Sequence, residues 1–331
     1  MESPARPVTV AVGQFDVRLG DIDANLASAG RLAERAAEAG ASLLLLPEMA
    51  TAGYAFASPE ELRPYAEPAT ATELGRGLTG WAELGRRHGL LIAGGFPELA
   101  GPSTSADPAA GGGASALAAA DGPAHGSLYN SAAIVGAGGL VGLYRKVHLF
   151  FNEKDLFRPG DLGFPVFDLP FGRVGLQVCY DVFFPEAARS LALGGADLVL
   201  TPGNFVRNFR RRIHDERGMI QAGVAAMGIA AQNQVYVAVA DRIGDERDLG
   251  FIGGSVIVGW DGWPLAGPAS EAGEELLVAE VDLAEAARKK QRNPRNHAFA
   301  DRREDQYRTT SSVAADGAGT GRGEPAASAS A

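Results

Sequence analysis

The stretch Ser42-Leu43-Leu44-Leu45-Leu46-Pro47-Glu48 contains four consecutive leucines that end at a proline and a glutamate. An unbroken apolar run of this length is typical of a strand that is covered on both faces, as in a parallel sheet. Residues 22–39 precede it, with apolar positions at helical spacing and a stop at Gly40. Residues 8–15 predict a further strand before that helix. The order strand, helix, buried strand indicates an α/β fold.

The same alternation continues along the chain. Further helices are predicted over residues 71–88, 185–193 and 210–231. Further strands are predicted over residues 90–96, 128–135, 140–149, 166–169, 173–178, 197–202, 235–240, 254–258 and 276–281. The link Gly136-Ala137-Gly138-Gly139 predicts a hairpin between two of them. This pattern indicates one large sheet or two packed sheets, with helices outside.

Two segments differ in composition from the rest of the chain. Residues 99–126 and 309–331 consist mostly of glycine, alanine, serine and other small or polar residues. Such segments cannot bury enough apolar area to hold one conformation. We therefore expect a mobile surface insertion at 99–126 and a disordered tail at 309–331. No linker divides the remainder, so residues 1–308 are expected to form one domain.

The overall composition excludes several classes of protein. The 331 residues carry 30 basic and 40 acidic side chains, a formal net charge of −10, and 46% of the residues are hydrophobic. This acidic balance argues against nucleic-acid and polybasic membrane partners, which need clustered positive charge. No apolar run approaches the roughly 18 residues of a membrane span. Because the N-terminus also lacks the features of a signal peptide, we expect a cytoplasmic protein.

Cys179 is the only cysteine, which excludes an internal disulfide and a cysteine-clustered metal site. It lies between a predicted strand and a helix that begins near Pro185. This order resembles a nucleophile elbow, and a helix N-terminus together with a nearby cation would favour the thiolate. The alternative is that Cys179 is a small buried hydrophobic residue.

Glu48 and Lys146 are the other two candidates for chemistry. Glu48 follows the leucine run, where desolvation would suit it to proton transfer, although a surface turn would explain it as well. Lys146 lies in the predicted strand 140–149 and is one of only four lysines. Its ammonium could stabilise an oxyanion, or it could simply point into solvent. His148 would share its face on an extended strand, and we expect a structural role for that histidine.

Taken together, these contexts resemble the nitrilase superfamily of carbon–nitrogen hydrolases. The matching segments are Leu45-Leu46-Pro47-Glu48 with Gly53-Tyr54, Tyr144-Arg145-Lys146-Val147-His148-Leu149, Cys179-Tyr180-Asp181 with Phe184-Pro185-Glu186, Gly20-Asp21 with Asn25, Tyr129-Asn130-Ser131, Pro159-Gly160-Asp161 and Asp301-Arg302-Arg303. The resemblance extends to about Tyr307. It implies a four-layer α-β-β-α sandwich with two mostly buried sheets, paired into a dimer or a larger assembly. It also implies that no metal or organic cofactor is needed.

The resemblance assigns roles residue by residue. Cys179 corresponds to the nucleophile, Glu48 to the general base and Lys146 to the oxyanion stabiliser. A second glutamate of the family corresponds to Glu153, with Asp155 as the competing position. The residues implied for oxyanion and substrate binding are Tyr54, Phe150, Tyr180 (through its backbone N–H), Asn204 and Phe205.

The residues after the cysteine indicate the branch of the family. Branches that act on nitriles typically have Trp-Glu there, whereas this chain has Tyr180-Asp181, which looks more like the amidase branches. Carbamoyl-amino-acid hydrolases often have basic residues next, whereas residues 182–184 are Val-Phe-Phe. An apolar wall suits an uncharged acyl group, unless Arg207 or Arg210 holds a carboxylate. We therefore expect hydrolysis of a small amide, with release of ammonia or an amine.

Several alternatives stay open. Within enzymes they are an N-carbamoyl-amine hydrolase, a nitrilase and a glutaminase-type ammonia supplier, and outside enzymes a silent ligand-binding scaffold. Ile229 and Gln232 stand where the family often has arginine and glutamate, which weakens the assignment to a subfamily. Residues 293–307 are polar yet match the family, and we expect them to reach a neighbouring subunit.

Overall fold

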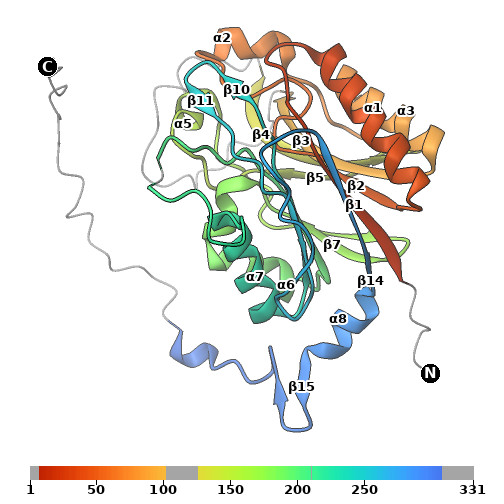
Figure 1. The fold of residues 1–331 in the computed structure, drawn as a ribbon, viewed down its shortest axis with the longest axis vertical. Coiled ribbons are helices and arrows are strands. Elements are labelled where there is room, and N and C mark those ends of the chain that lie inside the picture. Colours follow the sequence, from red (N-terminus) through yellow and green to blue (C-terminus); the bar gives the residue numbers. More distant parts are fainter. Residues whose placement is uncertain (1–6, 102–125, 210, 308–331) are drawn as a thin grey trace, which may run out of the picture.

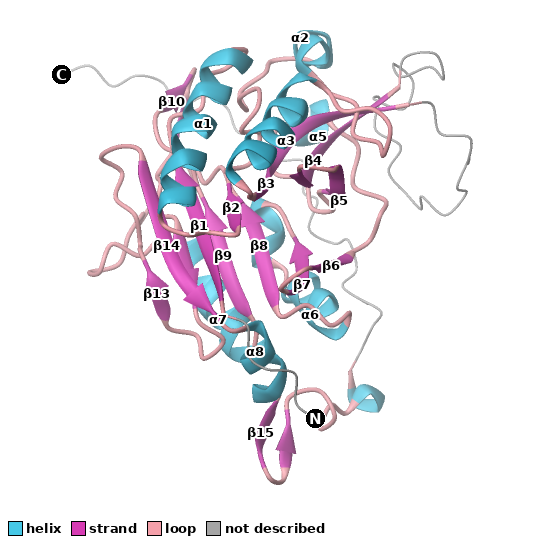
Figure 2. Ribbon diagram, turned by 90° about the vertical axis from the view of Figure 1, so that its right-hand side faces the viewer, coloured by secondary structure: helices cyan, strands magenta, loops and turns pink. Residues whose placement is uncertain are grey.

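Two six-stranded sheets lie face to face in the computed structural model, which describes residues 7–101, 126–209 and 211–307 (Figures 1 and 2). Strand β1 packs against β9, and β3 packs against β8, across the two sheets. Most of the predicted insertion and the whole predicted tail lie outside the described residues.

The first sheet has the strand order β14-β1-β2-β3-β4-β5. In that order its strands are Glu275–Val281, Val8–Gln14, Leu43–Leu45, Leu91–Ala100, Ser127–Gly136 and Gly139–Arg145. Strand β2 is parallel to both β1 and β3, as the doubly buried leucine run predicts. The predicted hairpin joins β4 to β5.

The second sheet has the strand order β13-β12-β9-β8-β7-β6. Its strands are Pro264–Ala266, Val256–Val258, Tyr236–Ala240, Leu198–Pro202, Gly172–Leu176 and Val166–Leu169. Strand β8 is parallel to its neighbours β7 and β9. Each sheet therefore has a parallel centre and antiparallel edges.

Helices cover the outer face of each sheet and complete the predicted four-layer α-β-β-α sandwich (Figure 1). α1 (Ile22–Glu38) and α3 (Arg76–His88) cover the first sheet, and α6 (Pro185–Leu193) and α7 (Gln221–Asn233) cover the second. Asp21 caps α1 by accepting a hydrogen bond from the Ala24 N–H at 3.0 Å. The shorter helices are α2 (Pro59–Leu62), α5 (Glu153–Leu156) and α8 (Leu283–Lys289), with 3-10 turns at Arg63–Tyr65, Cys179–Phe183 and Glu304–Gln306.

The leucine run explains why the layers stack in this order. Leu43 and Leu45 belong to the core between the two sheets, whereas Leu44 and Leu46 belong to the core under α1 and α3. All four side chains are fully buried. Because side chains alternate along a strand, four leucines in a row supply both cores at once.

Two predicted helices begin later than expected. The helix predicted from residue 71 begins at Arg76, because Thr70 and Glu73 form a turn in which the Thr70 hydroxyl accepts the Glu73 N–H at 2.9 Å. The helix predicted over 210–231 is α7, which begins only at Gln221. Asp215 accepts the N–H groups of Arg217 and Met219, both at 2.8 Å, and this turn replaces the first part of the predicted helix.

The predicted strand 140–149 is also shorter, because β5 ends at Arg145. Beyond it, the backbone N–H of His148 donates to Asp181 and that of Phe150 donates to Glu153. These N–H groups are therefore bonded to side-chain carboxylates and not to the carbonyl groups of a neighbouring strand. Lys146 therefore stands just past the strand, and His148 does not share its face. Helix α8 and the strand pairs β10 (Asp245–Glu246) with β11 (Leu249–Gly250) and β15 (Gln291–Asn293) with β16 (Asn296–His297) were not predicted.

Among the described residues, no helix is both long and apolar enough to cross a bilayer.

Gly95 provides a test of how tightly the chain is packed at Glu48 and Met49, just after the leucine run. A Cβ atom at this position would lie 2.5 Å from the Glu48 Cα and 2.6 Å from the Met49 nitrogen. We expect Gly95→Ala to lower the free energy of unfolding by about 1–3 kcal/mol, because backbone atoms must move. Denaturant unfolding measures this change. Gly138→Ala is the control, since a Cβ atom there meets nothing within 4 Å, and equal stability of both variants would contradict the packing argument.

Candidate active site

The site is built from residues that follow the ends of strands in both sheets. From the first sheet come Glu48 after β2 and Lys146 after β5, and from the second come Cys179 after β7, Asn204 after β8 and Asp241 after β9. Parallel strands end at the same edge of a sheet, so their following residues gather there.

Lys146 lies between two carboxylates. Its Nζ donates to Glu48 Oε1 and to Glu153 Oε1, each at 2.7 Å. The side chains of Lys146 and Glu48 are 0% exposed and that of Glu153 is 2% exposed. Asn130 Nδ2 also donates to Glu48 Oε1 at 2.7 Å. The other oxygen, Glu48 Oε2, is buried without a hydrogen-bond partner among the described residues.

Glu153 is held from two more sides. The Tyr54 hydroxyl donates to its Oε1 at 2.7 Å, and the Phe150 backbone N–H donates to its Oε2 at 2.9 Å. The structure therefore brings Glu153 to Lys146, whereas the competing Asp155 is exposed. The backbone of the Tyr54 loop is fixed in turn by Glu246, which accepts the N–H groups of Tyr54 and Ala55, each at 2.8 Å.

Cys179 begins a tight turn directly after β7. Its φ is +46°, a left-handed conformation that is uncommon for a residue other than glycine. The buried carboxylate of Asp181 fixes this turn by accepting the Val178 N–H at 2.9 Å and the Tyr144 hydroxyl at 2.7 Å. His148 Nδ1 lies 2.7 Å from the same carboxylate, which gives His148 the structural place expected of it.

Burial and charge set the protonation states in this cluster. Burial raises the pKa of the Cys179 thiol well above its usual value, Glu48 raises it further, and Lys146 lowers it only in part. Lys146 therefore favours the thiolate, as expected of a nearby cation, while burial and Glu48 favour the thiol more strongly. Burial alone would lower the pKa of Lys146, but Glu153 and Glu48 outweigh it and raise that pKa, so the ammonium stays charged. Burial raises the pKa of Glu153 despite the opposing effect of Lys146.

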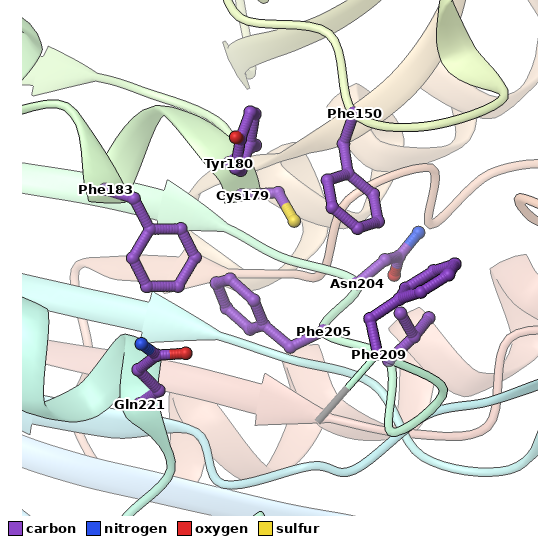
Figure 3. A pocket seen from close by; sticks show the side chains of 9 residues that line it. Phe150, Cys179, Tyr180, Phe183, Asn204, Phe205, Phe209 and Gln221 are labelled. Atoms are coloured by element: carbon purple, nitrogen blue, oxygen red, sulfur yellow. The ribbon is translucent and has the colours of Figure 1, made fainter. Parts of the chain in front are cut away.

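A cavity of about 350 Å³ opens beside Cys179 (Figure 3). It is lined by Phe150, Cys179, Tyr180, Phe183, Asn204, Phe205, Val206, Phe209 and Gln221. None of these lining residues is charged. A chain of ring contacts runs around the sulfur, with centroid distances of 5.8 Å for Phe209–Phe150, 5.2 Å for Phe150–Tyr180 and 6.1 Å for Tyr180–Phe183.

The other residues singled out in the sequence take different places. Tyr180, Asn204 and Phe205 line the cavity, whereas Tyr54 is engaged with Glu153 and is not a lining residue. Of the apolar residues 182–184, only Phe183 lines the cavity. The ring of Phe184 stacks on that of His148, with 3.7 Å between the ring centroids. Arg207 donates to Glu271 at 3.1 Å outside the cavity lining, and Arg210 lies outside the described residues.

Sequence reasoning assigned no role to Asn130 or Asp241. Each is a fully buried polar residue at or near a strand end, and Asn130 belongs to one of the segments that carried the family resemblance. A polar side chain inside an apolar strand is the signal that could have identified Asn130, whereas Asp241 lies just past β9. Among the described residues, no group of three or more His, Cys, Asp or Glu side chains is arranged to hold a metal ion.

Comparisons with known proteins place this fold and sequence beside one family of enzymes. The profile of the carbon-nitrogen hydrolase family matches residues 9–291. A nitrilase of Pyrococcus abyssi is 40% identical over 91% of this chain and 99% of its own length, and an N-carbamoylputrescine amidase of Solanum tuberosum is 31% identical over 86% of this chain and 89% of its own length. An amidase structure from Nesterenkonia sp. AN1, with acrylamide added to its active-site cysteine, superposes with a TM-score of 0.62 and 27% identity, covering 86% of this chain and 98% of that chain.

Replacing the buried ammonium tests whether the three charges depend on one another. We expect Lys146→Met to cost about 3–5 kcal/mol of unfolding free energy, because two buried carboxylates lose their common partner. The double variant Lys146→Met with Glu153→Gln should regain part of this loss, since one of the two charges is gone.

Denaturant unfolding of both variants measures the effect. Lys289→Met is the control, because that lysine is 46% exposed and its removal should change stability little. If Lys146→Met unfolds like the unsubstituted protein, the three groups are not coupled in the way the distances indicate.

Proposed function

This chain belongs to the carbon-nitrogen hydrolase family, and we propose that within it the chain hydrolyses small amides with an uncharged, largely apolar acyl group. It is an enzyme that cleaves the C–N bond of small amides through a cysteine nucleophile. The observation that carries the finer proposal is the aromatic cavity beside Cys179, whose described lining residues are all uncharged, while Glu48, Lys146 and Glu153 are buried and do not belong to that lining.

In the first half-reaction, Cys179 Sγ attacks the carbonyl carbon of the amide, and Glu48 takes the thiol proton. Burial raises the pKa of the Cys179 thiol, which favours attack and proton transfer in one step. The C–N bond then breaks, Glu48 returns the proton to the departing nitrogen, and ammonia or an amine leaves. The product on the enzyme is a thioester between Cys179 and the acyl group.

Lys146 and the backbone N–H of Tyr180 stabilise the oxyanion of the tetrahedral intermediate. Both are fixed before the substrate binds, Lys146 by its two carboxylates and Tyr180 by the turn that begins at Cys179. Donors that are fixed in a dry site need no reorganisation during the reaction, and losing one typically costs about 10²–10³ in rate.

The second half-reaction uses water in place of the cysteine. Glu48 takes a proton from a water molecule, the resulting hydroxide attacks the thioester carbonyl, and the C–S bond breaks. The leaving sulfur regains a proton from Glu48, which restores the thiol and releases the carboxylic acid. Glu153 takes no proton in these steps, and it accepts hydrogen bonds from the Lys146 ammonium and from the Tyr54 hydroxyl.

The cavity limits the substrate class. Tyr180, Phe183 and Phe205 offer an apolar surface to the acyl group, and Asn204 supplies a polar group in the same wall. A substrate carboxylate would find no arginine or lysine among the described lining residues, so these residues would not compensate its desolvation. Hydrolysis of an N-carbamoyl amine is the second candidate, because a relative with that activity in its name is 31% identical to this chain.

Release of ammonia from a panel of primary amides tests the proposal. Amides of uncharged acids such as hexanamide and benzamide should be hydrolysed, and the half-amide of succinic acid should be at least about tenfold slower, since its carboxylate would be buried without a partner. Intact-protein mass spectrometry should detect the acyl thioester on Cys179.

Cys179→Ala is the matched control and should release no ammonia above background. A preference for the charged half-amide would overturn the substrate class. Consumption of an N-carbamoyl amine but of no simple amide would favour the second candidate.

The assembly and location are further parts of the proposal. We infer a homodimer or larger homo-oligomer formed by one catalytic domain, residues 1–308, in the cytoplasm, where a reducing environment keeps Cys179 free. Leu193 in α6 and Val224 in α7 expose large apolar side chains, 44% and 53% exposed, on the outer helical layer, where a second copy could pack.

Removing residues 293–331 tests how copies associate. In the described part of this segment Phe299 contacts Arg189 of α6, with 5.4 Å between the guanidinium carbon and the ring centroid. We expect the truncated protein to be monomeric by light scattering, because the segment would lie between subunits. If the truncated protein remains a dimer, residues 293–331 do not form the interface between subunits.

A further inference from the structure

Asp241 is a buried acid that the proposed reaction does not use. It follows β9 directly and is 0% exposed. Its Oδ1 accepts the backbone N–H groups of Phe205 at 2.9 Å and Arg242 at 2.8 Å, and its own N–H donates to Ser255 Oγ at 2.9 Å. Its second oxygen, Oδ2, is buried without a hydrogen-bond partner among the described residues. Burying an ionised carboxylate costs much free energy when only one of its two oxygens accepts hydrogen bonds.

The surrounding charges do not compensate a negative Asp241. The two charged side chains that act on it are Arg242 and Glu48. The Arg242 guanidinium is engaged elsewhere, by Glu246, Asp16 and the Val17 carbonyl. Glu48 carries the same sign as an ionised Asp241. Burial raises the pKa of Asp241 well above its usual value, the two backbone N–H groups and Arg242 oppose this, and Glu48 adds to the rise.

The segment that Asp241 holds touches both the nucleophile and the proposed base. Asn204 and Phe205 form part of the cavity wall beside Cys179, and the Asn204 backbone N–H lowers the pKa of the thiol. Gly203 accepts the Glu48 N–H at 3.3 Å and donates its own N–H to the Ala240 carbonyl at 2.7 Å. The turn formed by residues 203–205 is therefore fixed at one end by β9 and at the other by the Asp241 carboxyl group.

We propose that Asp241 is a positioning residue of the active site, which holds the turn of residues 203–205 against Cys179 in its uncharged, protonated form. This inference rests on the proposed function only for the identity of the nucleophile. Protonation keeps a second negative charge away from Glu48, and Oδ1 remains free to accept the two backbone hydrogen bonds. Ionisation would place two carboxylates near each other in the interior and would weaken the turn beside the sulfur.

The protonation state can be tested by stability alone. An acid that is neutral in the fold contributes stability that is complete below its unfolded pKa of about 3.9 and is lost progressively as the pH rises toward the folded value. Asp241→Asn keeps the acceptor and has no proton to lose, so it escapes this loss. The melting temperature of Asp241→Asn relative to the unsubstituted protein should therefore increase from pH 5 to pH 8, about the range in which the unfolded chain is ionised.

Asp168→Asn is the control, because that side chain is 86% exposed. Its melting temperature relative to the unsubstituted protein should not rise with pH. A constant or falling difference for Asp241→Asn would show that Asp241 is charged in the fold and would overturn the inference. This measurement needs no substrate, so its outcome is independent of whether amides are hydrolysed.

The positioning role can be tested through Cys179, which is the only thiol. Alkylation by iodoacetamide, followed by intact mass at pH 7 to 9.5, reports the environment of the sulfur without any substrate. We expect Asp241→Asn to match the unsubstituted protein within about threefold at pH 7, and Asp241→Ala to differ by about tenfold or more, since small displacements of a site have effects of this size.

Amide hydrolysis, where it occurs, adds a second readout. Asp241→Asn should retain kcat and should extend activity to higher pH, because the unsubstituted protein loses the neutral form of Asp241 there. Equal alkylation of the Ala and Asn variants at every pH would overturn the positioning role. Absence of amide hydrolysis in all proteins would count against the proposed function and would leave the alkylation and melting results to decide this inference.

Discussion

One ammonium shared by two carboxylates in the dry interior is the interaction on which the rest of the structure depends. Removing such charges from water costs several kcal/mol for each ion, and only close pairing with complete hydrogen bonding offsets that cost. Lys146 meets Glu48 and Glu153 at 2.7 Å, and Asn130, Tyr54 and the Phe150 N–H complete the bonding. These groups come from distant parts of the chain, so the charged cluster can form only when the first sheet has closed around it. Fold and site are therefore one cooperative unit.

Cys179 follows a strand of the second sheet, and contacts between the two sheets fix its position relative to Lys146. Tyr144 lies in β5 of the first sheet, and its hydroxyl donates to Asp181, which fixes the turn after β7 of the second sheet. His148 contacts the same carboxylate from the segment that follows Lys146. The strand that ends at the ammonium is thus bonded directly to the turn that carries the sulfur. The apolar core between the sheets brings them together, and this buried hydrogen bond fixes their register at the site.

Short stretches of sequence predicted those features that depend on neighbouring residues alone. The leucine run predicted a doubly buried strand, because alternation along a strand places Leu43 and Leu45 in one core and Leu44 and Leu46 in the other. The segments around Glu48, Lys146 and Cys179 indicated the family through their resemblance to its motifs, each of which is short and local in the sequence. The prediction of a helix from residue 210 was wrong, because a turn formed by Asp215 competes with the first helical turns. The role of Asp241 could not be predicted, since its partner Phe205 is far away in the sequence and the burial of its unpartnered Oδ2, seen among the described residues, is a property of the folded interior.

The hydrogen bonds of Glu48 fit the two roles proposed for it, as an anchor of the site and as an acceptor of the thiol proton. Oε1 is committed to Lys146 and Asn130, whereas Oε2 has no partner among the described residues. The thiol of Cys179 is held in its protonated form by burial, which raises its pKa, and by the negative charge of Glu48. In the proposed reaction, a proton that moves from the sulfur to Oε2 neutralises Glu48 while the negative charge passes to the substrate oxygen, so the net charge of the interior is unchanged. An uncharged Asp241 keeps that balance, because a further negative charge in the same interior would oppose the buildup of charge on the substrate oxygen.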